Sequence, residues 1–536
     1  PKAKESPHDI VETGHSSTSI SAALGILTGQ ELQQRQGKVI AVIGDGSFTG
    51  GMAFEALNHA GHLRKNLIIV LNDNQMSISA NVGALSRYLS RITATKLYQS
   101  IRNRIDVSVE RIPVFGSDLM DLIERLKKGV KAVFFKETLF SDLGFEYVGP
   151  IDGHNLTSLH SVLRAVRELN KPVVVHVVTQ KGRGYPLAEG DPTMFHGVGP
   201  FSLVDGKIEK KSPLSFSDVF SRAIVRRAAA EPKIATITAA MAHGTGLVRF
   251  QQRFPERFFD VGISEQHAIT FAAGLALSGM KPVVALYSTF LQRSVDQVIH
   301  DVALPGLPVV IIVDRAGLVG GDGETHQGMY DISLFRPVAG MTILSPASAE
   351  ELEAMLSYCL SVDGPSLIRY PKAACSETMA VCEELVVGRG VFAKKNDGEH
   401  LIMASGGLLD EAVDAANRLT EKGIVTDVYN LRFVKPLDRS FIVDLIARYE
   451  SVLLVEDAVE SGGIGEQVLG ICAQDGIGTD LRIRGIPESF DARGTRRELL
   501  GRCGLDGAGI ASMVFEKQPA KRYYRLNRPS GIDASL

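Results

Sequence analysis

The chain has 536 residues, which are too many for one hydrophobic core and predict about three domains. Its 45% hydrophobic and 22% charged residues are typical of a globular protein, and the net charge of −3 argues against nucleic acid or an anionic membrane surface as a partner. No apolar run reaches the length of a membrane span, and no signal peptide opens the chain. The five cysteines are scattered and lack metal-ligand spacing, which predicts reduced thiols and a cytoplasmic location.

The first predicted elements form a strand–helix–strand unit. They are a strand from Val39 to Ile43, a helix from Thr49 to Leu63 and a strand from Leu67 to Leu71. Gly44-Asp45-Gly46 follows the first strand and Asn72-Asp73-Asn74 follows the second, at the edge where open α/β sheets bind ligands. Glycines there let a ligand approach closely, and the helix start offers N–H groups to phosphate.

Asp45 and Asn74 are candidate metal ligands. Their hard oxygen atoms suit a Mg²⁺ ion that bridges to a diphosphate. The spacing is similar to the Gly-Asp-Gly…Asn signature of thiamine diphosphate enzymes. The alternative is that Gly44-Asp45-Gly46 is an ordinary turn in which Asp45 caps a helix.

The rest of the first domain, predicted over residues 1–200, contains fewer signals. The basic stretch from Ser86 to Pro113 is interpreted as a solvated face or a mobile loop. A helix is expected from Ser117 to Gly129, and two more strands are expected over residues 145–149 and 173–178. The second of these strands leads into the loop from Lys181 to Tyr185, and residues 187–213 are interpreted as a linker.

Strands and helices continue to alternate in a second domain, 214–380, and in a third, 388–536. The predicted strands cover residues 234–238, 258–263, 283–287, 309–313, 341–344, 366–369, 401–404, 425–429, 452–455 and 481–486. This alternation predicts an α/β protein with three doubly wound parallel-sheet domains.

Glu265 is the candidate acid of the second domain. It follows a predicted strand and opens an apolar helix, so we expect its carboxyl group to be desolvated and its pKa to be raised. Thiamine chemistry requires such an acid beside the pyrimidine ring of the cofactor. A helix-capping glutamate, favoured by the helix dipole, is the alternative.

A series of motifs then occurs in order along the chain. They are Gly14-His15-Ser16-Ser17-Thr18-Ser19, Gly44-Asp45-Gly46, Asn72-Asp73-Asn74-Gln75-Met76-Ser77-Ile78-Ser79, Lys181-Gly182-Arg183-Gly184-Tyr185, Glu265-Gln266-His267, Tyr287-Ser288-Thr289-Phe290-Leu291-Gln292-Arg293, Asp314-Arg315-Ala316-Gly317 and Asp322-Gly323-Glu324-Thr325-His326-Gln327-Gly328. Together they resemble the 1-deoxy-D-xylulose-5-phosphate synthase family, which is related to transketolase. The likeness covers essentially the whole chain.

The resemblance implies a transketolase-like architecture that binds thiamine diphosphate and Mg²⁺. It implies a condensation of pyruvate with D-glyceraldehyde 3-phosphate to carbon dioxide and 1-deoxy-D-xylulose 5-phosphate, a precursor of isoprenoids, thiamine and pyridoxal. It also implies a homodimer, in which the third domain supplies structure and dimer contacts. An anion site at Gly462-Gly463-Ile464-Gly465 is the alternative role for that domain.

The resemblance also assigns roles to individual residues. Metal ligands would be Asp45, Asn74 and the carbonyl of Met76, and the cofactor would contact Gly14, His15, Ser16, Gly46, Ser47, Asn74, Tyr185 and the acid Glu265. The substrate channel would contain Tyr287, Phe290, Arg293, Arg315, Asp322, His326 and Arg369, with His196 reaching in from the linker, and Glu265, His326 and His196 would be catalytic.

The chemistry and position of some of these residues support their roles independently of the resemblance. Arg315 and Arg369 each lie at a strand end, where a guanidinium group suits the phosphate of a sugar phosphate, although a surface or interdomain ion pair is the alternative. His326 is suited to proton transfer or to holding the pyruvate carboxylate, although a histidine in a loop is more often merely exposed. Asp322 would orient either His326 or the acceptor hydroxyl.

One departure and several alternatives remain. The family carries two further histidines upstream of Gly14, in a segment this sequence lacks, so we expect a longer native protein or a weak or inactive form. Alternatives to the synthase are a transketolase that acts on ketose phosphates, the thiamine-dependent part of a 2-oxoacid dehydrogenase, and a catalytically dead scaffold. The presence of Asp45, Asn74 and Glu265 together disfavours the scaffold.

Overall fold

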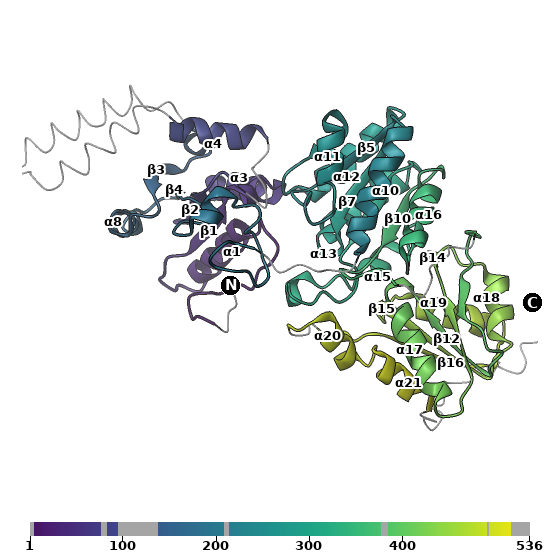
Figure 1. Ribbon diagram of the computed structural model, residues 1–536. Coiled ribbons are helices and arrows are strands. Elements are labelled where there is room, and N and C mark those ends of the chain that lie inside the picture. The colour runs from purple at the N-terminus through teal and green to yellow at the C-terminus, as the bar shows by residue number, and fades with distance from the viewer. Residues whose placement is uncertain are drawn as a thin grey trace, which may run out of the picture. The chain divides into compact units, whose positions relative to one another are not determined.

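The computed structural model describes residues 5–76, 83–94, 138–207, 214–376, 384–489 and 493–515 (Figure 1). The chain divides into two compact units. Unit 1 comprises residues 1–314 and 360–365, and unit 2 comprises residues 315–359 and 366–536. Among the described helices, none is long and apolar enough to cross a membrane. The four cysteines within the described ranges are all free thiols.

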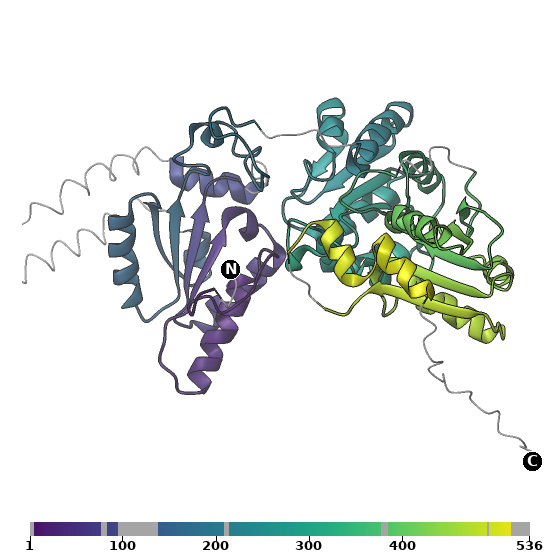
Figure 2. The same cartoon turned by 60° about the horizontal axis from the view of Figure 1, so that its bottom comes forward.

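The first sheet of unit 1 is built from four parallel strands in the order β1-β2-β4-β3. These strands are β1 (Ile40–Gly44), β2 (Ile68–Asp73), β3 (Glu146–Asp152) and β4 (Val173–Val178). In β2 and β4, apolar side chains point to both faces of the sheet and are mostly buried, as is typical of parallel strands, whereas Ile40 and Val42 of β1 are exposed. Ile69 and Leu71 face α1 (Ser19–Leu32) and α3 (Gly51–Leu63), whereas Ile68 faces α8 (Leu156–Arg167). Figure 2 shows this layering, with the purple α1 and the blue α8 on opposite sides of the sheet.

Four further helices accompany this sheet, and α2 directly follows β1 at the edge that carries the predicted metal ligands. They are α2 (Asp45–Phe48), α4 (Ala84–Ala94), α7 (Leu139–Asp142) and α9 (Pro186–Gly190). The helix expected from Thr49 begins two residues later, at Gly51, and α2 precedes it as a separate turn. The helix expected from Ser117 to Gly129 and most of the basic stretch lie outside the described residues.

The second group of strands in unit 1 is parallel and has the order β8-β7-β5-β6. They are β5 (Ile234–Thr238), β6 (Phe258–Asp260), β7 (Lys281–Tyr287) and β8 (Val310–Asp314). The main helices around them are α10 (Phe216–Ala230), α11 (Val248–Arg253), α12 (Glu265–Leu277) and α13 (Ser288–Leu291). A capping box between Ser215 and Asp218 fixes the start of α10.

In unit 2, a short strand group precedes the C-terminal sheet. Strands β9 (Thr342–Leu344) and β10 (Ser366–Arg369) are parallel, and β14 (Phe433–Lys435) runs antiparallel to β9. Helices α15 (Asp331–Phe335) and α16 (Ala349–Cys359) accompany them.

The C-terminal sheet has the order β11-β13-β12-β15-β16. Its strands are β11 (Val391–Lys394), β12 (His400–Ala404), β13 (Thr426–Asn430), β15 (Ser451–Val459) and β16 (Asp480–Ile486). Helices α17 (Leu409–Thr420), α20 (Arg496–Cys503) and α21 (Gly507–Phe515) bury one apolar core against it. Figure 2 shows the yellow α20 and α21 lying over this sheet, and α18 (Arg439–Ile446) and α19 (Ile464–Gln474) complete the unit.

The predicted parallel α/β architecture is confirmed, with two additions. The edge strand β11 and the short strand β14 are antiparallel to their neighbours and were not predicted. Both contain only three or four residues and end in a lysine, so neither has the apolar pattern that marked the buried strands.

Candidate active site

Asp45 and Asn74 lie at the same edge of the first sheet. Gly44 at the end of β1 pairs in register with Asn72 in β2, so the residues that follow these positions are neighbours. Asp45 is buried and accepts hydrogen bonds from the backbone N–H groups of Gly46 and Asn74. The side-chain oxygen of Asn74 accepts a hydrogen bond of 3.0 Å from the N–H of Met76. The structure therefore brings the predicted metal ligands together.

A second buried carboxyl group, that of Asp73, lies against Asp45. Burial and the neighbouring Asp73 raise the pKa of Asp45 to about 7. His176 Nε2 lies 3.0 Å from Asp73 Oδ2, and Tyr147 holds the opposite ring nitrogen at 2.7 Å. Burial by itself raises the pKa of Asp73, but the hydrogen bond and charge of His176 reverse this and lower it.

This pair of carboxyl groups fits a divalent cation. Two buried carboxyl groups side by side repel each other when both are charged, and a cation with a preference for oxygen ligands relieves that repulsion. Among the described residues, no group of three or more His, Cys, Asp or Glu side chains is arranged to hold a metal. The predicted donor set at this edge, Asp45 with the Asn74 side chain and the Met76 carbonyl, contains a single carboxylate.

The loop from Gly14 to Ser17 is packed tightly beside this edge. Ser17 has a left-handed backbone conformation with φ of 75°, and its hydroxyl donates a 2.6 Å hydrogen bond to the carbonyl of Ser47. A Cβ atom on Gly50 would lie 2.4 Å from the Ser17 hydroxyl and 3.2 Å from the carbonyl of Ile263. The loop thus contacts the α2 region and lies next to Gly50, which also faces the segment that leads to Glu265.

Glu265 is the first residue of α12, and it is 2% exposed. Burial raises its pKa, and the nearby Arg293 opposes this effect only in part. Arg293 Nη1 lies 3.5 Å from Glu265 Oε2, and Nη2 donates to the carbonyl of Ser16. The expected desolvated carboxyl group is confirmed, and Arg293 connects it to the Gly14–Ser17 loop.

His15 joins the same cluster through a residue that was not predicted. Its Nε2 atom lies 2.8 Å from the hydroxyl of Thr289, and its ring lies 4.9 Å from that of Phe290. Tyr287 stacks on Phe290 with a centroid separation of 5.9 Å. The structure therefore gathers His15, Tyr287 and Phe290 as expected. Thr289 was part of the quoted motif, but a lone hydroxyl gave no separate signal.

The segment after β4 carries His196 and Tyr185. His196 Nδ1 lies 2.6 Å from the Nζ atom of Lys181, which belongs to a quoted motif but had no predicted role of its own. Burial and then the charge of Lys181 lower the pKa of His196, and burial lowers the pKa of Lys181. Tyr185 packs against Phe195 and donates its hydroxyl to the carbonyl of Leu203 at 3.0 Å. Its cofactor contact stays a prediction.

In unit 2, the segment that we call the 315–328 loop holds three predicted substrate residues. Arg315 has a φ of 61°, and its Nε atom lies 3.5 Å from Asp322 Oδ2. Lys372, which was not predicted, also binds Asp322 at 3.2 Å. Burial raises the pKa of Asp322, but the charges of Lys372 and Arg315 outweigh it and lower the value. Burial lowers the pKa of His326 despite the opposing charge of Asp322.

Arg369 ends β10 and is engaged in a buried ion pair. Its side chain is 2% exposed, and its guanidinium group forms a paired contact with Asp331 at 2.8 and 3.3 Å. It also donates to the carbonyl of Asp457 at 2.7 Å. A phosphate anchor must present donors to the ligand, whereas these donors are used inside unit 2. The place of Arg369 in the substrate channel therefore stays a prediction, and its donors would have to leave Asp331 to reach a phosphate.

Known proteins resemble the chain over nearly its whole length. A 1-deoxy-D-xylulose-5-phosphate synthase of Treponema pallidum (strain Nichols) is 47% identical over 514 residues, covering 96% of this chain and 82% of the relative. 1-Deoxy-D-xylulose-5-phosphate synthase 1 of Geobacter sulfurreducens is 48% identical over 518 residues, covering 96% and 81%. The chain belongs to the 1-deoxy-D-xylulose-5-phosphate synthase family.

Family models match the three parts of this synthase family member in order. Residues 1–179 match the 1-deoxy-D-xylulose-5-phosphate synthase model, residues 212–377 the transketolase pyrimidine binding domain, and residues 390–510 the transketolase C-terminal domain. The enzyme is thus of the transketolase type and depends on thiamine diphosphate, as the motifs predicted.

Solved transketolases share the fold of this synthase family member. The structure of a split-gene transketolase, an inactive beta4 tetramer, aligns with a TM-score of 0.51 at 26% identity, covering 56% of this chain and 97% of that one. The transketolase of Campylobacter jejuni aligns with a TM-score of 0.50 at 16% identity, covering 94% and 82%. These likenesses confirm the predicted transketolase-like α/β architecture.

Proposed function

We propose that this chain condenses pyruvate with D-glyceraldehyde 3-phosphate and releases carbon dioxide, forming 1-deoxy-D-xylulose 5-phosphate for isoprenoid, thiamine and pyridoxal synthesis. The observation that carries this proposal is the desolvated Glu265 beside the Gly14–Ser17 loop, within a chain of this family. Bound thiamine diphosphate supplies a nucleophilic carbon and an electron sink for the decarboxylation of pyruvate.

Asp45, Asn74 and the carbonyl of Met76 hold Mg²⁺ in this proposal. The support is the buried Asp45–Asp73 pair at the edge of the sheet, which suits a cation with oxygen ligands. The adjoining cofactor contacts are Gly14, His15, Ser16, Gly46, Ser47 and Tyr185.

Glu265 donates a proton to the pyrimidine ring nitrogen of the cofactor. Because burial raises the pKa of this carboxyl group, it holds a proton at a higher pH than an exposed glutamate. Arg293 lies on one side of the carboxyl group and, through Ser16, keeps the Gly14–Ser17 loop against it. Tyr287 and Phe290 form a stacked apolar wall that excludes water from this region.

The acceptor half of the reaction uses the 315–328 loop. Arg315 binds the phosphate of the acceptor, and Lys372, which contacts the same oxygen of Asp322 as Arg315, adds a second positive charge. His326 transfers a proton in its neutral form, which burial favours by lowering its pKa. Asp322 orients His326 or the acceptor hydroxyl, and His196, next to Lys181, is a further proton carrier.

We further infer domain limits of 1–200, 214–380 and 388–536, which the matched ranges 1–179, 212–377 and 390–510 support. We also infer a homodimer, as the family resemblance implies, and a cytoplasmic location, which the scattered cysteines favour. Neither inference affects the chemistry above.

The decisive experiment supplies 2-¹³C-pyruvate and D-glyceraldehyde 3-phosphate to the purified chain, with and without Mg²⁺ and thiamine diphosphate. The expected result is labelled 1-deoxy-D-xylulose 5-phosphate by NMR, dependent on both additions and lost in Glu265→Gln. A transketolase is the alternative, because two of the matched family models are transketolase domains. Transfer from a ketose phosphate without pyruvate, and no carbon dioxide release, would establish that activity instead.

A further inference from the structure

The 315–328 loop is closed at its base by its own hydrogen bonds. Gly317 and Gly328 exchange both backbone hydrogen bonds, at 2.7 and 2.8 Å. The side chain of Gln327 accepts from the N–H of Val319 at 2.7 Å and donates to the carbonyl of the same residue at 3.2 Å. Arg315, Asp322 and His326 are therefore carried by one connected segment, and whatever holds the base of the loop sets their position.

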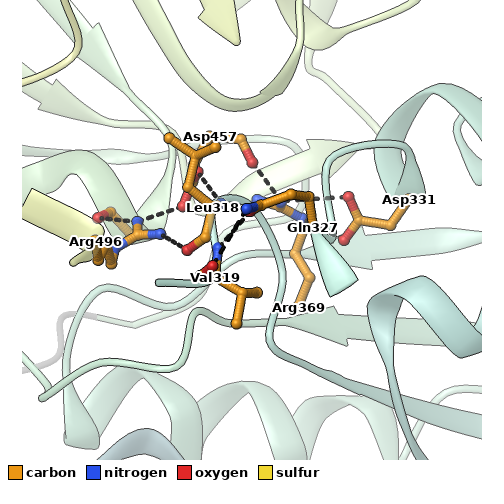
Figure 3. A network of polar contacts seen from close by, with 8 residues as sticks. Leu318, Val319, Gln327, Asp331, Arg369, Asp457 and Arg496 are labelled. Carbon is orange, nitrogen blue, oxygen red and sulfur yellow. Dashed lines mark hydrogen bonds and ion pairs between the residues drawn. The ribbon is translucent and has the colours of Figure 1, made fainter. Parts of the chain in front are cut away.

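A charged pair from the C-terminal part of unit 2 holds that base (Figure 3). Asp457, in β15, accepts a hydrogen bond from the N–H of Leu318 at 3.2 Å. Arg496, the first residue of α20, donates to the carbonyl of Leu318 at 2.8 Å and forms an ion pair with Asp457. The side chains of Asp457 and Arg496 are 1% and 15% exposed. Both backbone polar groups of Leu318 are thus bound by one pair of charged side chains.

The backbone of the loop packs closely against Asp457 and Arg496. Gly317 has a φ of 73°, and a Cβ atom there would lie 2.0 Å from Asp457 Oδ1. A Cβ atom on Gly320 would lie 2.9 Å from both the backbone nitrogen of Arg496 and the carbonyl oxygen of Gly494. A shift of Asp457 or Arg496 would therefore move the backbone between Arg315 and Asp322.

We propose that Asp457 and Arg496 are positioning residues for the acceptor half of the reaction. They touch neither substrate nor cofactor in this proposal, but fix the loop that carries Arg315, Asp322 and His326. The proposal rests on the proposed function of that loop, and it gives the third domain a role in acceptor recognition beyond structure and dimer contacts. Misplacing reactive groups by about 1 Å can cost roughly 10²-fold in rate, so a loosened base should be measurable.

The test compares Asp457→Asn and Arg496→Ala with the wild type, and Arg496→Lys serves as the conservative rescue. Glu351→Gln is the matched control, because Glu351 is also a buried carboxylate paired with an arginine in unit 2, Arg432, at 2.6 Å. Among the described residues, Glu351 contacts Ala347, Ser348, Asn430 and Arg432, none of which belongs to the 315–328 loop.

The first measurement is hydrogen exchange in peptides that cover the 315–328 loop, which needs no activity. We expect exchange to be faster by about tenfold or more in Asp457→Asn and Arg496→Ala, to be partly restored in Arg496→Lys, and to be unchanged in Glu351→Gln. The second measurement is steady-state kinetics of the holoenzyme. We expect the KM for glyceraldehyde 3-phosphate to rise by about 10- to 100-fold in the first two variants, with the KM for pyruvate within a few-fold of wild type.

Three results would overturn the proposal. They are unchanged exchange in the loop, faster exchange with an unchanged acceptor KM, and equal effects of Glu351→Gln, which would indicate general destabilisation. Failure of the proposed function is a different outcome, because the wild-type chain would then form no product from pyruvate and the acceptor.

Discussion

The imidazole of His15 lies 2.8 Å from the hydroxyl of Thr289, although 274 positions separate the two residues in the chain. A second contact between the same two parts of the chain is the hydrogen bond from Arg293 to the carbonyl of Ser16. Through these two contacts, the loop expected to line the cofactor is fixed to the segment that holds Glu265. The proposed cofactor site therefore combines both sheets of unit 1.

Thr289→Val should weaken thiamine diphosphate binding. The substitution keeps the shape of the side chain but leaves His15 without this hydrogen bond, whose net value is about 0.5–1.5 kcal/mol, or roughly 2- to 10-fold in affinity. Calorimetric titration at fixed Mg²⁺ measures the effect. Thr270→Val, which removes the exposed Thr270–Asp301 contact, is the control. Equal affinities in the two variants would show that the orientation of His15 does not affect the cofactor.

Glu265→Gln should slow exchange of the cofactor C2 proton while the cofactor remains bound. Removing a positioned acid typically costs about 10²- to 10⁴-fold. Exchange followed by NMR in deuterated buffer is the measurement, and titration of the cofactor is the control for occupancy. Exchange close to the wild-type rate would leave Glu265 as a helix-start residue without a chemical role.

The same variant should be more stable than the wild type without cofactor at neutral pH. The pKa of Glu265 is raised by folding, so its stability contribution is fully present below the ordinary value near 4.5 and is lost as pH rises through the folded pKa. Each unit of elevation is worth about 1.4 kcal/mol. Urea unfolding at pH 4 and pH 7 measures the difference. The gain in unfolding free energy of the variant over wild type should be larger at pH 7 than at pH 4. An equal gain at the two pH values would contradict the raised pKa.

The sequence predicted the strands and the proximity of Asp45 to Asn74, because both depend on local patterns. Asp45 and Asn74 follow apolar strands that pair in register, so their proximity follows from topology alone. Lys181, Thr289 and Lys372 were missed, because each acquires its role from a partner that only the tertiary structure brings close. The pairing of Arg369 with Asp331 was missed for the same reason. The strand end at Arg369 was predicted, but Asp331, which binds this arginine in the core, carries no signal in the sequence.

Asp45→Asn should weaken cofactor binding that depends on Mg²⁺, because an amide is a poorer ligand for a hard cation than a carboxylate. Titrating thiamine diphosphate at several Mg²⁺ concentrations should show an affinity lower by tenfold or more, in line with the roughly 10- to 100-fold losses seen when metal-site partners are changed. Asp152→Asn, at the end of β3 in the same sheet, is the control. If affinity for the cofactor were unchanged, Asp45 would serve only as a turn residue.

His326→Asn should remove an acidic limb from the pH profile of kcat/KM for the acceptor. Burial lowers the pKa of His326 below its ordinary value of 6.5. The wild-type side chain therefore stays neutral until the pH falls below this lowered pKa. Activity should then decline as His326 gains a proton, whereas the variant should be slower by about 10²-fold or more at its optimum and flat in this range. Persistence of the limb in His326→Asn would assign it to another group.

Arg369→Ala should reduce stability, because the substitution leaves Asp331 as an unpaired charge inside unit 2. Breaking a buried pair by removing one partner typically costs about 3–5 kcal/mol. Arg315→Ala, by contrast, should change stability little and raise the KM for glyceraldehyde 3-phosphate far more than for unphosphorylated glyceraldehyde, since about 2–5 kcal/mol is lost with one partner of a desolvated charged contact. Urea unfolding and acceptor kinetics on both variants separate the two roles.

A double substitution makes the role of Arg369 testable in a second way. Replacing a buried ion pair by apolar residues of similar size is often neutral or stabilising, so Arg369→Met combined with Asp331→Leu should recover much of the stability lost in either single variant. A phosphate anchor predicts no such recovery, because its energetic partner is the substrate. If Arg369→Ala kept wild-type stability and instead raised the KM only for the phosphorylated acceptor, the guanidinium group would have to leave Asp331 during the reaction, and Arg369 would join Arg315 at the phosphate.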